Sequence, residues 1–290
     1  MQIGQVAIED KNYPKLLKQI KEPPKKLYYK GNWNSGIFEN CLAVVGSRRL
    51  TSYGRKITEQ IVTELTLAGL TIVSGFMYGG DEAAHSATVL AGGKTIAVMP
   101  CGIDIIHPEY QENLYKEILE KDGLIISEFK GNFPPAVWTY PKRNRIVAGL
   151  SKAVLVVEAG LRSGSLITAD FAKKFNRKIF AIPGPITSEV SKGANQLIKE
   201  GASAVTSAKD ILDFYNVKAE NIVSKKASRQ NIEFLQTKME KRIIEQLRIE
   251  TMDMNSLAQN LDMPISKIAT ILSLMQLKGI VQQQGNKYHL

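Results

Sequence analysis

Apolar residues follow two alternating patterns along the middle of the chain. Short runs rich in apolar and β-branched residues, such as 42–45, 70–73 and 153–157, predict strands buried on both faces. Between them, apolar residues recur every three or four positions, as from 57 to 68, and predict amphipathic helices. This alternation predicts an α/β fold: a Rossmann-like, doubly wound and mostly parallel sheet, whose ligand lies at the carboxyl ends of the strands.

Further segments continue the series toward the C-terminus. Strands are expected at 95–99, 124–127, 178–182 and 202–205, and helices at 80–91, 109–120, 141–149, 164–175, 193–200 and 208–214. Together with the first runs, they predict a Rossmann-like domain over residues 41–215.

The two ends of the chain have a different character. Residues 1–40 are rich in Pro, Lys and Tyr and are expected to form a lead-in segment that packs on the core. Residues 216–231 are polar and aperiodic, which is typical of a linker. Residues 232–290 have the pattern of three helices and a hairpin, which predicts a small winged-helix domain. Its third helix carries few basic residues, so contact with protein and contact with DNA both remain open.

Composition limits the cellular locations expected for the protein. The 290 residues are 44% hydrophobic, and no apolar run approaches the ~20 residues that span a bilayer. The first residues lack the basic and apolar regions of a secretory signal. Cys41 and Cys101 lie beside predicted strands and are interpreted as reduced, buried thiols. We therefore expect a cytoplasmic protein without a membrane segment.

Positive charge is concentrated in one part of the chain. The net charge is +10, and residues 142–178 hold nine Lys and Arg against two acids, a local charge of +7. Residues 104–128 hold two Lys against seven acids, a local charge of −5. A solvated helix face explains the four basic residues of 173–178 equally well, but not Arg143 and Arg145, which precede a short apolar helix. The distribution indicates a polyanionic ligand.

Neither common nucleotide-binding motif is present. The first strand of the predicted domain ends in Gly46-Ser47-Arg48-Arg49, which is not the G-x-G-x-x-G of a dinucleotide site. Gly93-Lys94-Thr95 matches the end of a P-loop, but it precedes a strand instead of following one. We therefore expect no nucleotide cofactor.

Instead, turns of small residues follow several strands. They are Gly46-Ser47-Arg48, Ser74-Gly75, Ser163-Gly164-Ser165 and Pro183-Gly184. Small residues let the backbone approach an anion, and helix N-termini offer N–H groups to it. Each turn alone is explained by helix capping. Several of them at one sheet edge, with Arg48, Lys142, Arg143 and Arg145 as counter-charges, favour a phosphate site.

Signals for catalysis are weak. The three histidines share no metal-ligand spacing, and no nucleophile elbow is present. Asp81-Glu82 is explained by a helix N-terminus, and Glu158 is expected to orient an Arg or accept from backbone amides. We expect a binding protein without enzymatic activity or a bound metal.

Several segments resemble the DNA processing protein A (DprA, or Smf) family. They include Ala43-Val44-Val45-Gly46-Ser47-Arg48, Lys142-Arg143-Asn144-Arg145-Ile146, Val157-Glu158-Ala159 and Ser163-Gly164-Ser165-Leu166-Ile167-Thr168. The resemblance runs in order through residues 13–214. It implies a binder of single-stranded DNA that loads the RecA recombinase in natural transformation and recombination, and a homodimer formed through the Rossmann domain.

The resemblance also implies which residues contact DNA. They are Gly46, Ser47, Arg48, Lys142, Arg143, Asn144, Arg145, Ser163, Gly164, Ser165 and Thr168, with Arg49, Ser74, Gly75, Tyr78 and Gly184 as further candidates. The sequence departs from the family pattern at four positions, Tyr78, Gly80, Glu109 and Gln111. Tyr78 is a hypothetical base-stacking residue.

Two other functions remain open. Pro183-Gly184-x-x-Thr187-x-Glu189 partly resembles a motif of the lysine-decarboxylase-like phosphoribohydrolases, which are nucleotide-processing enzymes of the same fold class. Alternatively, the winged-helix domain binds duplex DNA as a regulator.

Overall fold

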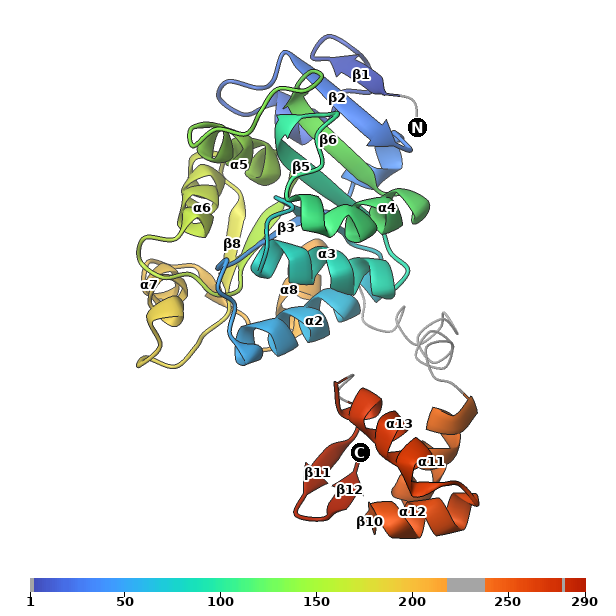
Figure 1. The fold of residues 1–290 in the computed structure, drawn as a ribbon. Helices are drawn as coiled ribbons and strands as arrows, with labels where there is room; N and C mark the ends of the chain where they lie inside the picture. The colour runs from blue at the N-terminus through green and yellow to red at the C-terminus, as the bar shows by residue number, and fades with distance from the viewer. Residues whose placement is uncertain (1–2, 218–237, 278–279) are drawn as a thin grey trace. The chain divides into compact units, whose positions relative to one another are not determined.

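The computed structural model describes residues 3–217, 238–277 and 280–290, and it divides the chain into two compact units, residues 1–224 and 225–290 (Figure 1). The predicted linker, 216–231, lies almost wholly outside the described residues. None of the described helices is both long enough and apolar enough to cross a membrane.

A nine-stranded sheet forms the centre of the first unit. Its order is β1-β2-β6-β5-β4-β3-β7-β8-β9. All neighbours from β6 to β9 are parallel, which confirms the predicted Rossmann-like, mostly parallel sheet. The strands are β1 (Gly4–Ala7), β2 (Lys26–Gly31), β3 (Cys41–Val45), β4 (Thr71–Ser74), β5 (Thr95–Gly102), β6 (Leu124–Phe129), β7 (Ala153–Val156), β8 (Lys178–Ala181) and β9 (Ser203–Ala204).

Helices cover both faces of this sheet (Figure 1). The face with α2 (Ser52–Leu67), α3 (Gly80–Leu90), α4 (Glu112–Glu120) and α8 (Ala208–Tyr215) is opposite the face with α1 (Lys15–Lys18), α5 (Thr139–Leu150), α6 (Gly164–Lys174) and α7 (Lys192–Lys199). Every residue of β3 and β7 is buried. Burial on both faces explains why these strands are continuous apolar runs in the sequence.

The predicted lead-in segment differs most from expectation. Residues 4–7 and 26–31 form β1 and β2, two strands that extend the sheet beyond β6 in antiparallel orientation. Lysines and adjacent tyrosines in KLYYKG obscure any alternation, so the sequence did not predict a strand there. This segment forms a strand because it pairs with β6, and not because its own sequence favours one.

The second unit has its own core. It contains α11 (Lys238–Ile249), β10 (Met252–Asp253), α12 (Met254–Leu261), α13 (Ile265–Leu277), β11 (Gln282–Gln284) and β12 (Lys287–His289). The strands form a three-stranded antiparallel sheet, and Gly285 turns the β11–β12 hairpin with a φ of 65°. Ile243, Leu257 and Leu272 are buried in its centre. The name winged-helix domain remains a prediction for this unit.

His85 of α3 is fully buried in the first unit, and its ring is hydrogen-bonded to the Thr95 side chain. Thr95 Oγ1 donates to the Ile72 carbonyl at 2.7 Å, so its lone pair accepts from His85 Nδ1, also at 2.7 Å. This arrangement requires a proton on Nδ1, and full burial of the ring favours its neutral form. Nε2 is buried and has no hydrogen-bond partner among the described residues, and Phe76 packs beside the ring. Burial, with a smaller contribution from Arg143, lowers the pKa of His85 to about 3.

Acidification from pH 7 to pH 5 is therefore expected to destabilise the first unit. An unfolded histidine has a pKa of about 6.5 and binds a proton that folded His85 does not, so its stabilising contribution is present above about pH 6.5 and is lost progressively below it. The free energy of unfolding, measured with urea, should fall by about 2 kcal/mol more in the wild type than in His85→Asn, which keeps a donor toward Thr95 but does not titrate. Equal pH slopes for the two proteins would refute this assignment.

Candidate nucleic-acid interface

A groove of about 890 Å³ lies at the carboxyl ends of β3 and β7. From β3 the chain continues to β4 on one side, whereas β7 continues to β8 on the other. The loops after the two strands therefore diverge, and such a switch point is where open α/β sheets bind ligands. The groove is lined by the loops after β3, β4 and β7 and by the N-terminal ends of α5 and α6.

Two glycine backbones cross at the base of this groove. A Cβ on Gly80 would lie 2.6 Å from the Gly46 Cα, so no side chain is accommodated there. Gly80 N donates to the Ser47 carbonyl at 3.0 Å, and Ser47 N donates to the Glu158 carbonyl at 2.6 Å. These bonds join the loops after β3 and β7 to the start of α3. The close approach gives a structural reason for Gly80, one of the departures from the family pattern.

The Glu158 carboxylate holds the loop after β3 in place by hydrogen bonds. It is buried and accepts from Thr51 N at 2.9 Å and from Thr51 Oγ1 at 2.6 Å. Thr51 in turn caps α2 by accepting from Gly54 N. The expectation that Glu158 accepts from a backbone amide is confirmed, and the hydrogen bonds give it a structural role.

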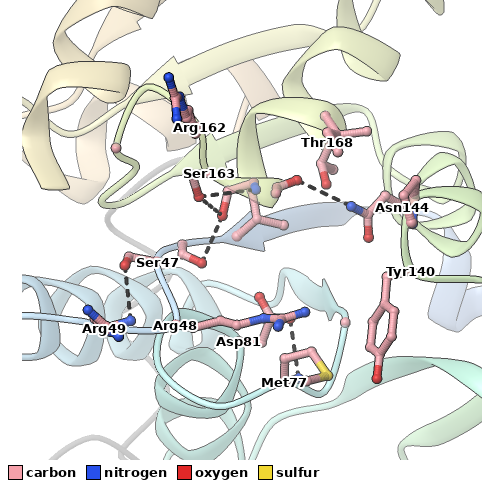
Figure 2. Close-up of a pocket in the computed structure, with 18 of the residues that line it drawn as sticks. Ser47, Arg48, Arg49, Met77, Asp81, Tyr140, Asn144, Arg162, Ser163 and Thr168 are labelled. Carbon is pink, nitrogen blue, oxygen red and sulfur yellow. Dashed lines mark hydrogen bonds between the residues drawn. The ribbon is translucent and has the colours of Figure 1, made fainter. Parts of the chain in front are cut away.

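The N-terminus of α6 forms the opposite wall. Ser163 caps the helix by accepting from Ser165 N at 3.3 Å, while Ser165 Oγ donates to the Gly46 carbonyl at 2.8 Å. Asn144 Nδ2 donates to the Gly164 carbonyl at 3.3 Å and links this wall to α5. Figure 2 shows the Ser47 hydroxyl turned toward Arg49, and Asn144 beside Thr168. Positive helix-end potential and small side chains make this wall suited to an anion.

Arg48 extends into the groove between two aromatic rings. Its guanidinium carbon lies 5.5 Å from the ring centroid of Tyr78 and 5.3 Å from that of Tyr140. Figure 2 shows Arg48 and Tyr140. The Tyr140 hydroxyl is 2.9 Å from His107 Nε2, which fixes the ring. Arg48 remains exposed, so these cation–π contacts orient the charge without removing it from solvent. Tyr78, a second departure from the family pattern, thus packs on a basic residue.

Arg143 lies beneath the groove and is 4% exposed. Its Nη1 donates to the carbonyls of Gly75 and Val98, and its Nε donates to Asn144 Oδ1 at 3.1 Å. A Cβ on Gly75 would lie 2.6 Å from the guanidinium, so any side chain at this position would displace Arg143. Burial lowers the pKa of Arg143 to about 10, and nearby Asp81 opposes this change.

Asp81 is a buried acid in the wall of a site otherwise rich in positive charge. It lines the groove and accepts from Met77 N at 3.3 Å. Burial raises its pKa, while the positive charge of Arg143 opposes the increase. The buried charges of Asp81 and Arg143 therefore offset each other. The exposed positive charge of the groove comes from other residues.

Lys142 and Arg145 lie outside this groove. Arg145 Nη2 is 2.6 Å from Glu128 Oε1, and Lys142 Nζ is 3.5 Å from Glu128 Oε2. Both line a separate cavity beside β2 and the end of β6. The residues of the Lys142–Arg145 motif therefore point to different places, because successive residues of a helix are about 100° apart.

The chain was compared with known proteins. The family model for "DNA recombination-mediator protein A" matches residues 5–216. The chain belongs to this family. The matched region covers the nine-stranded sheet from residue 5 onward and both walls of the groove, and the resemblance expected from the sequence is confirmed.

Curated relatives and solved structures agree with this membership. Protein Smf of Escherichia coli K12 is 41% identical over 72% of this chain, but the match spans only 55% of Smf. DNA processing protein DprA of Streptococcus pneumoniae is 43% identical over 71% of this chain and 72% of that protein.

Two solved structures share the fold. The crystal structure of DprA from S. pneumoniae has 42% identity and a TM-score of 0.69 over 73% of this chain and 74% of that one. DNA processing protein A from Helicobacter pylori, a structure described for its single-stranded DNA binding mode, has 31% identity and a TM-score of 0.66 over 74% of this chain and 95% of that one.

Most of the predicted site residues of this family member lie together. Those that line the groove are Gly46, Ser47, Arg48, Arg49, Gly75, Tyr78, Arg143, Asn144, Ser163, Gly164, Ser165 and Thr168. Lys142, Arg145, Ser74 and Gly184 do not line it: Ser74 Oγ donates to the buried Val44 carbonyl, and Gly184 is bonded to Asn195. DNA contact by any of these residues remains a prediction.

Tyr140 and Arg162 are groove residues suited to DNA contact that were not predicted from the sequence. Tyr140 packs on Arg48, and exposed Arg162 lies in the loop after β7. Tyr140 could have been predicted from its position next to the basic Lys142-Arg143 motif. Adjacency to the Ser163 turn was the corresponding signal for Arg162.

The burial of Arg143 leads to a stability prediction. Arg143→Ala removes the donors to Gly75 and Val98 and leaves Asp81 buried without its neighbouring cation, which should lower the free energy of unfolding by about 3–5 kcal/mol. Arg48→Ala, the matched exposed arginine, should lower it by at most about 1 kcal/mol. Urea denaturation of both variants measures the difference. Similar losses for the two variants would contradict a structural role for Arg143.

Proposed function

We propose that the chain binds single-stranded DNA through its phosphates in the groove between the β3 and β7 loops. The observation that carries the proposal is exposed Arg48, oriented by Tyr78 and Tyr140 opposite the Ser163 turn. Backbone amides of such loops and a bidentate guanidinium suit phosphate oxygens, and nearby aromatic rings suit unstacked bases. Family membership and the H. pylori structure described for single-stranded DNA binding support the same ligand.

The proposed role is that of a recombination mediator without enzymatic activity. Family membership supports a DNA-processing, recombination-mediator role. Loading of RecA onto the bound strand, and a homodimer formed through the first unit, are finer proposals that rest on the family resemblance. For the second unit we propose a winged helix that contacts protein or DNA.

A binding experiment tests the proposed ligand. We expect a labelled oligothymidylate to bind the wild type, with an affinity that falls steeply with salt because phosphate contacts release counterions. Fluorescence anisotropy at two salt concentrations measures both properties. Arg48→Ala should weaken binding about tenfold or more and reduce the salt slope by about 0.7, the contribution of one phosphate contact on a single strand.

Controls separate the alternatives. Arg55 is an exposed arginine on α2 outside the groove, so Arg55→Ala should bind like the wild type. Unlabelled duplex and AMP should compete poorly. Wild-type affinity in Arg48→Ala would refute the groove assignment. Displacement by AMP with release of free base would favour a nucleotide-processing enzyme, and preferential displacement by duplex would favour a regulator.

A further inference from the structure

The N-terminal end of α5 separates the groove from a second surface. Val137, Tyr140 and Asn144 are spaced by three and four residues and line the groove. Trp138 and Lys142, also four residues apart, lie on another side of the same helical turn. Val137, which is 90% exposed, directly precedes Trp138 and so lies between the groove and this other side.

Aromatic side chains form a platform on this second surface. Phe129 and Phe133 stack at a centroid distance of 4.6 Å, and both meet Trp138 at steep angles, 84° and 73°. Neither ring stacks flat on the indole, and Trp138 is 54% exposed. Lys142 Nζ lies 5.3 Å from the Phe129 ring centroid and 5.7 Å from that of Trp138. An exposed indole held by packed rings and a lysine is suited to stacking on an unpaired base.

A basic cavity of about 450 Å³ continues from this platform. Lys142 belongs to both, and Arg145, Lys25 and Lys26 complete the positive lining against the carboxylates of Glu22 and Glu128. The structure thus shows four cationic side chains against two anionic ones. Glu128 holds Arg145 and Lys142 in place.

The two lysines where β2 begins, Lys25 and Lys26, are free to contact a ligand. Lys25 and Lys26 are exposed, and neither pairs with any carboxylate in the described part of the chain. Arg145 is buried, and its Nη1 has no hydrogen-bond partner among the described residues. Unpaired cations at a cavity mouth attract phosphate, whereas a solely structural network would be neutralised.

We propose that single-stranded DNA leaves the groove over the N-terminal end of α5, stacks a base on Trp138 and places a following phosphate against Lys25, Lys26 and Lys142. Together these four residues are termed the exit surface. The inference rests on the proposed function, because it extends the path of the same strand. Aromatic stacking beside a basic track is the usual composition of a site for single strands without sequence preference. A duplex cannot present an unpaired base to Trp138, so the exit surface also favours single strands.

Strand length separates the exit surface from the groove. Oligothymidylates from about 4 to about 20 nucleotides should bind the wild type with an affinity that rises again once the strand outreaches the groove. In Trp138→Ala and in the double variant Lys25→Ala/Lys26→Ala, this second rise should shrink about tenfold or more, while short strands bind as to the wild type. Trp138→Phe, which keeps an aromatic face, should restore most of the affinity.

Two controls accompany the series. Lys173→Ala/Lys174→Ala removes an adjacent pair of exposed lysines from the last turn of α6, away from both surfaces, and should retain the wild-type length dependence. Trp33 is the only other tryptophan, so Trp33→Phe isolates the fluorescence of Trp138. Long strands should quench this fluorescence, and short strands should leave it unchanged.

The outcomes are distinguishable. Unchanged length dependence in the exit-surface variants, an equal loss in the Lys173/Lys174 control, or no quenching of Trp138 would overturn the exit surface while leaving groove binding intact. Short strands that bind Arg48→Ala like the wild type would instead remove the proposed function itself.

Discussion

The hydrogen bonds from the buried guanidinium of Arg143 hold the proposed binding site together. One planar group on α5 reaches the carbonyl of Gly75, just past β4, and that of Val98, within β5, and it also contacts Asn144 on its own helix. These contacts fix the helix that carries Tyr140 against the sheet. Because Tyr140 packs on Arg48, the position of the exposed charge depends on the buried one.

Four adjacent residues of α5, 142–145, have different surroundings: some are buried and some line a cavity. Arg143 is structural, and Asn144 links α5 to the start of α6. Lys142 and Arg145 lie with Glu128 in the second cavity. A dense basic motif in a sequence therefore need not form one patch. In this helix, the geometry of a single turn divides the three positive charges between the core, which holds Arg143, and the second cavity, which holds Lys142 and Arg145.

The sequence predicted the sheet well because its central strands are buried on both faces, and continuous apolar runs such as Leu42–Val45 are distinctive. It also predicted most of the groove, since parallel strands bring the turns that follow them to one edge. It did not predict β2, whose strand character depends on pairing with β6. Nor did it show that Lys142 and Arg145 leave the groove, because the side of α5 that meets the sheet is set by tertiary packing. Tyr140 was missed because an aromatic residue beside a basic motif is equally consistent with a core position.

The crossing of Gly46 and Gly80 has a consequence for the energetics of recognition. With their backbones in contact and joined to the β7 loop by hydrogen bonds, the walls of the groove cannot adjust independently. Such a site is preorganised, so little conformational entropy of the protein is lost when a ligand arrives. The ordering is then required of the ligand. A flexible single strand can adopt the shape of the groove at modest cost, whereas a stiff double helix would first have to be unpaired.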